Sequence, residues 1–361
     1  MCGFAGFVDN LDVNTKNKVI HDMADTIIHR GPDGEGYFTD DSVAMGFRRL
    51  SIIDLSLGNQ PLFNEDKSLV INFNGEIYNY KEIREDLVKK GHVFTTNSDT
   101  ETIIHGYEEY GTDIVDKLRG MFAFVIWDTK NKQLFGARDP FGIKPFYYYT
   151  APDLFVYGSE IKSFLKHPNF KKELNKDALK TYLMYQYSVP TDSFFVNVHK
   201  LNPGHCFVYK DGKMEIRQYF KIEYRNNNDD LDTAVDKINN IMKESVQYHK
   251  ISDVEVGAFL SSGVDSSYIV ANANVDKAFT VGFEGENVKQ KDFNECANAD
   301  DLCKILGMKH KQKNINADMF FDILPTVQYH SDEPHANLSA VPLYYLANMA
   351  SKEVKVVLSG E

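Results

Sequence analysis

The sequence is poor in cysteine, with four among 361 residues, and no two of them form a close pair. Cys296 and Cys303 lie seven residues apart in a predicted helix, which is not the spacing of a zinc site. So few and so scattered cysteines also exclude a disulfide framework. We interpret these two residues as core thiols.

Long hydrophobic runs and excess basic charge are lacking too. The longest apolar run, Met121–Trp127, has seven residues, whereas a membrane-spanning helix needs about 20. The formal charge of −12 argues against a nucleic-acid-binding protein, because phosphates are neutralised by clustered Lys and Arg. Since only Met1 precedes Cys2, no signal peptide is expected. We therefore expect a cytoplasmic protein with neither a membrane nor a nucleic-acid partner.

Cys2 directly follows Met1. The simpler interpretation is an accidental second residue. If Met1 is removed, however, Cys2 carries both a thiol and a free α-amino group, whose ordinary pKa is about 7.7–8.0. A thiol becomes a strong nucleophile only when a base takes its proton. Cys2 would then combine nucleophile and base, and a reducing compartment would keep it a thiol.

The length suits two domains. Residues 2–210 read as many short strands with a few helices, which predicts a layered α+β domain. Residues 211–230 include the polar run Asn226–Asp230 and predict a linker. Residues 231–361 change to alternating strand, turn and helix, which predicts a parallel sheet covered by helices.

The elements of the first domain follow from composition and periodicity. Its strands are rich in β-branched and aromatic residues and are expected at Leu69–Phe73, Phe122–Trp127, Gln133–Ala137, Pro145–Tyr149 and Leu154–Tyr157. Its helices are expected at about 16–29, 80–90, 99–110 and 176–187. Ser98 and Glu101 have the spacing of a capping box for the third of them.

In the second domain a helix is expected from Leu231, followed by strands and helices in turn. The strands are expected at 255–260, 278–283, 309–315 and 354–358, and the later helices from about 266 and at 292–306, 317–329 and 339–351. The chain stops at Glu361, directly after the last strand, and ligands of open parallel sheets bind at that end of the strands. We therefore expect this domain to be cut rather than finished.

A short loop follows the first strand of this sheet, with the sequence Ser261-Ser262-Gly263-Val264-Asp265-Ser266-Ser267. Small residues let backbone N–H groups approach an anion, and the next helix directs its positive end to the same place. Asp265 is a candidate for holding Mg²⁺. No Gly-Lys-Ser/Thr follows, so this is not a Walker A loop. A plain capped turn is the simpler interpretation, and the loop alone leaves both open.

Polar residues of the first domain also allow two interpretations. Arg49 adjoins an apolar strand and is either a surface arginine or a two-point clamp for a carboxylate. Asn74 and Gly75 follow a strand, where a tight turn is the ordinary interpretation and an oxyanion hole the functional one. Asp99 begins a predicted helix, where the dipole alone favours a carboxylate.

Taken together, these residues lie in motifs that resemble the glutaminase domain of class II amidotransferases. The motifs are Cys2-Gly3, His29-Arg30-Gly31-Pro32-Asp33-Gly34, Arg49-Leu50-Ser51-Ile52-Ile53-Asp54, Asn74-Gly75-Glu76-Ile77-Tyr78-Asn79, Ser98-Asp99-Thr100-Glu101, Gly120-Met121-Phe122-Ala123-Phe124 and Ala137-Arg138-Asp139-Pro140-Phe141-Gly142-Ile143-Lys144-Pro145. The loop at 261–267, Asp332-Glu333-Pro334 and Val357-Leu358-Ser359-Gly360-Glu361 narrow the resemblance to glutamine-hydrolysing asparagine synthetases. Because the motifs run through nearly the whole chain in the family's order, the resemblance is more specific than any one of them.

The resemblance implies an αββα sandwich of the N-terminal-nucleophile type joined to an ATP-pyrophosphatase domain. It implies an AMP-forming, ATP-dependent ligase in which Cys2 attacks the side-chain amide of glutamine, with its own α-amino group as base through a water. Asn74 and Gly75 match the oxyanion donors. The positions that match the rest of the glutamine site are Arg49 and Leu50, Ile53, Glu76 and Asp99, with Arg49 on the α-carboxylate and the two acidic residues on the α-amino group.

In the second domain the resemblance implies a site for ATP and Mg²⁺, with aspartate as the acceptor. The matching ATP-binding positions are Leu260, Ser261, Gly263, Asp265, Ser266, Ser267, Val281, Ser359 and Gly360. Asp265 matches a Mg²⁺ ligand, and Glu361 matches a carboxylate implicated in amide formation. Ammonia from glutamine is expected to pass internally to β-aspartyl-AMP. A homodimer is implied as well.

This chain departs from the family at two places. The family's loop reads Ser-Gly-Gly, whereas Ser262 replaces the first glycine, at a cost of about 1 kcal/mol if that position needs a positive φ. The family continues beyond Ser-Gly-Glu into Gly-x-Asp-Glu, whose aspartate helps to bind Mg²⁺. We therefore expect a whole glutaminase half and an incomplete synthetase half.

Three functions stay open at this point. The first is asparagine synthesis, of which this incomplete chain would keep glutaminase activity alone. The second is amidation of another carboxylate, such as a peptide or a sugar acid. The third is a non-catalytic domain kept for binding or assembly. The combination of Cys2, Arg49, Asn74, Gly75 and Asp99 argues against the third.

Overall fold

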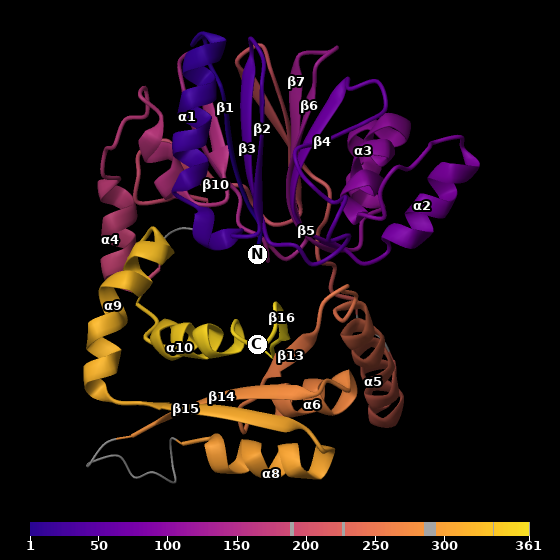
Figure 1. The fold of residues 1–361 in the computed structure, drawn as a ribbon, viewed down its shortest axis with the longest axis vertical. Coiled ribbons are helices and arrows are strands. Elements are labelled where there is room, and N and C mark those ends of the chain that lie inside the picture. Colours follow the sequence, from indigo (N-terminus) through magenta and orange to yellow (C-terminus); the bar gives the residue numbers. More distant parts are fainter. Residues whose placement is uncertain (188–190, 226–227, 285–293, 335, 361) are drawn as a thin grey trace. The chain divides into compact units, whose positions relative to one another are not determined.

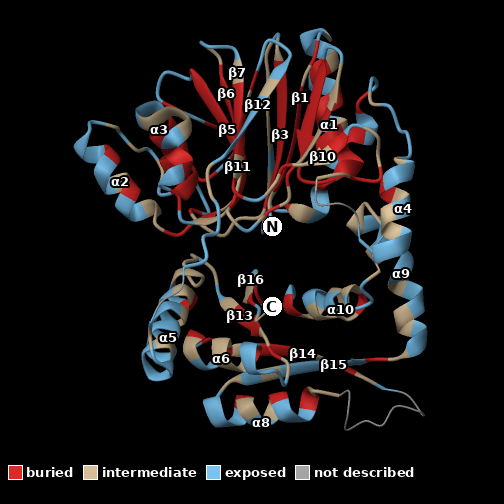
Figure 2. Ribbon diagram, turned by 180° about the vertical axis from the view of Figure 1, so that it is seen from behind, coloured by how far each residue is buried: buried red, intermediate tan, exposed pale blue. Residues whose placement is uncertain are grey.

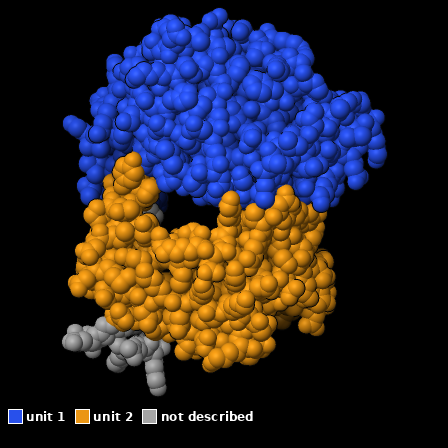
Figure 3. Space-filling model, in the orientation of Figure 1, with its two compact units in different colours: residues 1–224 blue, residues 225–361 orange. Residues whose placement is uncertain are grey.

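The chain folds into two compact units, Met1–Tyr224 and Arg225–Glu361 (Figure 3). The computed structural model describes residues 1–187, 191–225, 228–284, 294–334 and 336–360. Each unit has its own sheets and its own hydrophobic core. Among the described residues, no helix has both the length and the apolar character needed to cross a membrane.

The first unit contains two six-stranded antiparallel sheets (Figure 1). The first sheet has the order β10 (Val198–Lys200), β8 (Tyr147–Ala151), β9 (Leu154–Gly158), β1 (Gly3–Val8), β3 (Val43–Arg49) and β2 (Gly34–Thr39). The second has the order β12 (Lys213–Gln218), β11 (His205–Lys210), β7 (Gln133–Arg138), β6 (Gly120–Asp128), β5 (Leu69–Ile77) and β4 (Leu62–Phe63). The strands predicted from composition are all present, with bounds that differ by up to four residues.

Strand β6 shows why the two sheets stack. Its side chains alternate between the faces of the sheet, and both sets are apolar. Ala123, Val125 and Trp127 pack in the core between the sheets, whereas Phe122 and Phe124 pack with Ile126 on the opposite face. A strand that is apolar on both faces must be covered on both, at a gain of about 1.5–3 kcal/mol for each large side chain fully buried.

Helices cover the outer faces of both sheets. Helix α1 (Val13–Asp25) packs on the first sheet through a core that includes Ile20 and Met23. Helices α2 (Tyr80–Lys89) and α3 (Asp99–Tyr110) pack on the second. The unit is therefore the αββα sandwich that was predicted, with its buried residues concentrated in the sheets (Figure 2). The remaining helices among the described residues of the unit are the 3-10 helices Ile28–Arg30, Gly111–Asp116 and Ile161–Lys166 and the α-helix α4 (Lys176–Tyr185).

Two local predictions differ from the structure. Helix α1 spans Val13–Asp25 rather than 16–29, because the Asp12 carboxylate caps the backbone N–H groups of Asn14 and Thr15, each at 3.1 Å. At α3 the Ser98 hydroxyl caps the helix as predicted, by accepting from Thr100 N–H at 3.2 Å. Glu101 completes no capping box, because its carboxylate accepts instead from the N–H groups of residues 95 and 96, each at 2.7 Å.

The boundary between the units differs from the predicted one. Residues 211–230 were predicted to be a linker, but β12 (Lys213–Gln218) lies among them and pairs along its whole length with β11. The first unit therefore runs to Tyr224 rather than to residue 210. A polar, largely exposed edge strand is hard to distinguish from a linker by composition, because only one of its edges is paired.

The second unit has a four-stranded sheet that is entirely parallel, as predicted. Its order is β15 (Lys309–Ile315), β14 (Lys277–Phe283), β13 (Val256–Phe259) and β16 (Val356–Leu358). The core on one face includes residues of α5 (Leu231–Tyr248), α6 (Val264–Ala273) and α8 (Cys296–Leu306). Residues of α10 (Ala340–Ala350) pack on Phe279 in a second core, and α9 (Ala317–Ser331) precedes α10 in the chain.

Candidate active site

Cys2 stands at the head of β1, a strand in the interior of its sheet. The thiol donates to the carbonyl oxygen of Leu50 at 3.5 Å, and Leu50 N–H donates to Sγ at 3.3 Å. Burial raises the pKa of the Cys2 thiol. That rise is opposed only in part by the hydrogen bond from Leu50 and by the charges of the amino terminus, Lys144 and Arg49. The sulfur therefore stays a thiol at neutral pH unless a base takes its proton.

Arg30 holds the backbone of Cys2 in place. Its Nε donates to the Cys2 carbonyl oxygen at 2.9 Å, and its Nη1 donates to Glu160 Oε1 at 2.9 Å. Burial by itself would raise the pKa of Glu160, but His29, Arg30 and Lys162 outweigh it and lower that pKa to about 2. Glu160 is therefore a fixed negative charge that anchors Arg30, which in turn fixes the start of β1.

Arg49 lies at the end of β3 and is almost fully buried. Its Nη1 donates to Asn59 Oδ1 at 2.9 Å and to the Leu55 carbonyl at 3.3 Å. Its Nη2 donates to the carbonyl oxygens of Ile53 at 3.3 Å and Asp54 at 2.5 Å. The simpler interpretation of a surface arginine is wrong: the guanidinium organises the loop that follows Leu50.

Asn74 and Gly75 do not form the tight turn that their sequence suggests. They lie inside β5, which continues to Ile77, and pair with Ala123 and Phe122 of β6. Asn74 is 1% exposed, and its Nδ2 has no hydrogen-bond partner among the described residues. A Cβ atom on Gly75 would lie 2.7 Å from Phe122 Cα, so only glycine allows this close pairing. The strand therefore presents a buried amide donor that none of the described residues satisfies.

Glu76 and Asp99 bring two carboxyl groups into the same region. Asp99 Oδ2 accepts from Ile77 N–H at 2.9 Å, which ties the start of α3 to the end of β5. Burial, together with repulsion from Asp99, raises the pKa of Glu76 to about 7. Burial also raises the pKa of Asp99, to about 6, against the backbone N–H groups that it accepts from. Such buried neighbouring carboxyl groups favour a bound cation.

Lys144 is a residue to which the sequence analysis assigned no role. The fully buried Asp139 carboxylate positions its segment by accepting the N–H groups of Ile143 at 3.0 Å and Lys144 at 2.9 Å. Burial lowers the pKa of Lys144, while the charges of Glu76 and Cys2 act to raise it. The lysine thus lies within electrostatic reach of both the thiol and the carboxyl pair. Its only sequence signal is its place in a family motif, between Ile143 and Pro145.

In the second unit the serine-rich loop joins β13 to α6. Ser261 N–H donates to Ser266 Oγ at 3.2 Å, and the two hydroxyls lie 2.9 Å apart. Gly263 is the N-cap of α6, and its N–H donates to Ser261 Oγ at 3.1 Å. Ser262 has no positive φ, so it carries no backbone strain, and its hydroxyl donates to Glu295 at 3.1 Å. The serine at this position is therefore compatible with the loop.

A pocket of about 130 Å³ opens beside this loop. Six of the residues predicted to bind ATP line it: Leu260, Ser261, Ser266, Val281, Ser359 and Gly360. Gly360 packs directly on α6, because a Cβ atom there would lie 2.5 Å from Ser266 N. The pocket is smaller than the about 300–1,000 Å³ of whole small-molecule sites, so it would admit part of a nucleotide.

The other predicted residues of this site lie outside this pocket or outside the described residues. Gly263, Asp265 and Ser267 lie on the first turn of α6 or next to it and do not line the pocket. Glu361 lies outside the described residues. A larger hollow, of about 640 Å³, lies beyond the opposite end of β1 from Cys2 and contains none of the predicted residues.

Family models match both units. The model of the glutamine amidotransferase domain matches residues 1–220, and the model of asparagine synthase matches residues 237–361. The first match covers the sandwich with Cys2 at the head of an interior strand. The first unit is therefore a glutamine amidotransferase domain.

Similarity to whole proteins specifies the family further. The chain is 42% identical to "Asparagine synthetase [glutamine-hydrolyzing] 1" of Bacillus subtilis over 100% of its own length and 57% of that protein. It is 33% identical to "Putative asparagine synthetase [glutamine-hydrolyzing] 2" of Methanocaldococcus jannaschii over 100% of its length and 74% of that protein. The chain belongs to the family of glutamine-hydrolysing asparagine synthetases. It spans about half the length of several curated relatives that it matches, including a putative asparagine synthetase of Mycobacterium tuberculosis, 39% identical, of which 54% is covered.

Solved structures are more distant. A glutamine phosphoribosylpyrophosphate amidotransferase from B. subtilis has a TM-score of 0.45 and 16% identity over 86% of this chain and 65% of that chain. A glutamine aminotransferase class-II domain protein from Silicibacter pomeroyi has a TM-score of 0.31 and 10% identity over 61% of this chain and 99% of that chain. Structural similarity at these low TM-scores is not evidence for the function of this chain.

Proposed function

We propose that the protein makes asparagine from aspartate, with ammonia that its first unit releases from glutamine. The observation that carries the proposal is Asn74 Nδ2 on β5, a buried donor without a hydrogen-bond partner among the described residues. The chain is also a member of this family, and its second residue is a cysteine whose sulfur accepts from Leu50 and whose carbonyl oxygen accepts from Arg30. A donor left unpaired in the interior costs about 1–3 kcal/mol. That cost is recovered when an oxyanion accepts the hydrogen bond.

In the first step the Cys2 sulfur attacks the side-chain carbonyl carbon of glutamine. The carbonyl oxygen becomes an oxyanion, which accepts hydrogen bonds from Asn74 Nδ2 and Gly75 N–H. When the tetrahedral intermediate collapses, the C–N bond breaks, the amide nitrogen takes a proton and ammonia leaves. Water then hydrolyses the thioester to glutamate and restores the thiol.

The base in this step is the α-amino group of Cys2 once Met1 is removed. With Met1 present, burial lowers the pKa of the chain's amino group to about 5. Arg30 and Lys144, whose charges lower that pKa, also lie near the backbone of Cys2 and would favour the neutral form of an amine there. A neutral amine next to the thiol is able to accept its proton.

Glutamine is held by charge at its α-carbon. Glu76 and Asp99 take the α-ammonium group, whose charge stabilises both carboxylates in their ionised forms. Arg49 takes the α-carboxylate. Because its Nη1 and Nη2 already donate to four acceptors between Ile53 and Asn59, some of these bonds must be exchanged for bonds to glutamine. The loop that contains Leu50 and Ile53 then moves with Arg49, and both residues contact the substrate.

The second unit uses ATP. The pocket beside Leu260 and Val281 receives the adenosine, and the first turn of α6 receives phosphate oxygens through its N–H groups. Asp265, exposed on that turn, offers the carboxylate oxygens that Mg²⁺ prefers, and Ser266 and Ser267 offer hydroxyls. The donor set therefore fits Mg²⁺, which would neutralise phosphate charge there. Glu361 acts in amide formation, and ammonia reaches β-aspartyl-AMP by an internal route.

The decisive experiment compares the chain with its Cys2→Ala variant, after mass spectrometry has established that Met1 is absent. We expect Cys2→Ala to lose glutamine-dependent release of glutamate completely and to keep ATP binding, because the two reactions use different units. Cys206→Ala is the matched control and should keep both activities. Glutamate release by Cys2→Ala at the parental rate would overturn the proposal.

The alternative acceptors are separated by a different measurement. ATP–pyrophosphate exchange, measured with the full-length protein, should depend on aspartate and not on peptide or sugar acids. Exchange driven by another acid, and not by aspartate, would favour the second candidate function and leave the glutaminase step unaffected.

A further inference from the structure

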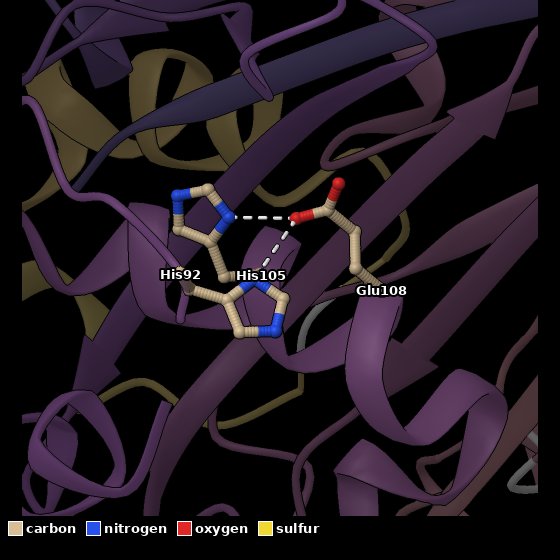
Figure 4. A group of neighbouring side chains, drawn as sticks. All are labelled: His92, His105 and Glu108. Atoms are coloured by element: carbon tan, nitrogen blue, oxygen red, sulfur yellow. Dashed lines mark hydrogen bonds and ion pairs between the residues drawn. The ribbon is translucent and has the colours of Figure 1, made fainter. Parts of the chain in front are cut away.

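A group of histidines and carboxylates lies on the second sheet's helical layer, away from Cys2. His105 and Glu108 occupy one face of α3, since residues three apart on a helix are neighbours, and His92 lies between α2 and α3. One ligand atom from each of the three lies within 4.8 Å of the others. Figure 4 shows both imidazole rings directed toward the Glu108 carboxylate.

The distances suit a small metal ion. Glu108 Oε2 lies 2.7 Å from His105 Nδ1 and 3.6 Å from His92 Nδ1. Ligands bound tetrahedrally at 2.0–2.1 Å lie about 3.3 Å from one another, and the two distances to Glu108 Oε2 lie on either side of that value. A fourth ligand is available from Glu65, in the turn between β4 and β5, whose Oε2 lies 3.7 Å from His105 Nδ1.

The far nitrogens of both histidines face carboxylates. His105 Nε2 is buried, lacks a hydrogen bond among the described residues, and lies 3.6 Å from Glu101 Oε1. His92 Nε2 lies 3.4 Å from Glu109 Oε2. Metal-bound histidines almost always present their second nitrogen to such an acceptor, which fixes the ring and its tautomer. In this chain Nε2 of each ring faces a carboxylate, and Nδ1 of each ring faces Glu108 Oε2.

Glu108 is oriented in the same way. Its Oε1 accepts from Asn64 Nδ2 at 2.7 Å, which leaves Oε2 to face the two imidazoles. Asn64 is itself buried and accepts from Leu69 N–H at 2.9 Å, so it is fixed to the start of β5. The ligand atoms are therefore held by a second set of contacts from different elements.

The charge around the two rings is strongly negative. Four carboxylates surround them, from Glu65, Glu101, Glu108 and Glu109, and Lys90 pairs with the last of these at 3.1 Å. Negative charge of this kind around two imidazoles attracts a divalent cation.

We propose that His92, His105 and Glu108, with Glu65 as a fourth ligand, form a binding site for a divalent transition metal, with zinc as the best fit. Two imidazoles with carboxylate oxygens suit zinc rather than magnesium or calcium, which prefer oxygen ligands alone. The bound ion connects α3 to the segment after α2 and to the turn after β4. Its role is structural, since these elements support Asp99 at the start of α3.

The test measures binding of zinc itself to the purified full chain after treatment with a chelator. We expect one zinc per chain in competition with a chromogenic chelator, and a visible spectrum typical of four-coordinate geometry when Co²⁺ is used instead. His92→Ala and Glu108→Gln should each weaken binding by at least about 10-fold, and Glu109→Gln, behind His92, by about 10-fold. Magnesium should not compete.

The control variant is His21→Ala, which removes an exposed histidine on α1 that stacks on Tyr37; it should bind zinc as the parent does. Circular dichroism verifies that each variant is folded without metal. Because His92 lies in a loop, its variant separates loss of a ligand from loss of the fold. No zinc uptake by the folded parent chain, or equal affinity in the parent and in folded His92→Ala, would overturn the proposal and leave a cluster of ion pairs in its place.

Discussion

Replacement of Asn74 is the most direct test of the proposed oxyanion hole. We expect Asn74→Ala to lower kcat for glutamine hydrolysis by about 10²–10³, the usual loss when one oxyanion donor is removed. The strand itself should persist, because β5 pairs with β6 through its backbone. The measurement is glutamate release, with circular dichroism as a check on the fold.

Asn72, two residues earlier on β5, offers a matched control. Its Nδ2 donates to the Gly46 carbonyl oxygen at 3.1 Å, so it connects the two sheets. Asn72→Ala should lower the Tm and leave kcat of the folded protein near the parental value. If both variants behave alike, Asn74 is a packing residue rather than an oxyanion donor.

The raised pKa of Glu76, about 7, makes stability depend on pH. An ordinary glutamate has a pKa of about 4.3, so between about pH 4 and 7 the folded state holds more protons than the unfolded state. The contribution of this carboxyl group to stability is therefore complete at low pH and is lost as the pH rises through 7. Glu76→Gln removes that loss. We expect its Tm to exceed the parental Tm at pH 8 by at least about 2 °C and to equal it near pH 4.

The control for this effect is Glu85→Gln, on the exposed side of α2. It should shift the Tm by the same small amount at both pH values. Glu76→Gln should also raise KM for glutamine, because one partner of the α-ammonium group is lost. A pH-independent Tm difference would contradict the assignment.

Strand β12 is the element on which we expect folding of the first unit to depend. It covers β11 along its whole length, Met214 packs against the core between the sheets, and Tyr219 donates from its hydroxyl to the Arg138 carbonyl oxygen at 2.6 Å. We expect residues 1–224 to fold alone, whereas residues 1–210 expose the edge of β11 and aggregate. Size-exclusion chromatography and thermal melting distinguish the two. A stable, monomeric 1–210 fragment would show that β12 is dispensable.

At the scale of the whole molecule, the two units should lose their functions separately. Asp265→Ala, on the first turn of α6, should weaken ATP binding in the presence of Mg²⁺ by at least about 10-fold, because a carboxylate ligand is lost. Basal glutamate release should remain. Asp232→Ala, at the equivalent position of α5, is the control. Unchanged ATP affinity in Asp265→Ala, measured by calorimetry, would remove the assigned role of this residue.

The sequence by itself determined the order and type of most elements. The alternation of strands and helices can be read from local sequence, so the four parallel strands of the second unit were recognised and β15 was predicted with its observed bounds. The motif residues near Cys2 and in the loop before α6 were also recognisable, because each motif is contiguous. Glycines such as Gly75 and Gly360 stand where a Cβ atom would collide.

Tertiary structure decided which groups meet. Asn74 lies within a strand rather than a turn because β6 pairs with it, and Arg49 is buried because the carbonyl oxygens of residues 53–55 converge on it. The place of Lys144 near Cys2 and the meeting of His92 with Glu108 also depend on it. Local patterns specify which face of an element is apolar, whereas distances between distant residues depend on how the sheets and helices pack. For that reason composition and motifs predicted the chemistry available to this chain, and packing alone determined where its charges and donors lie.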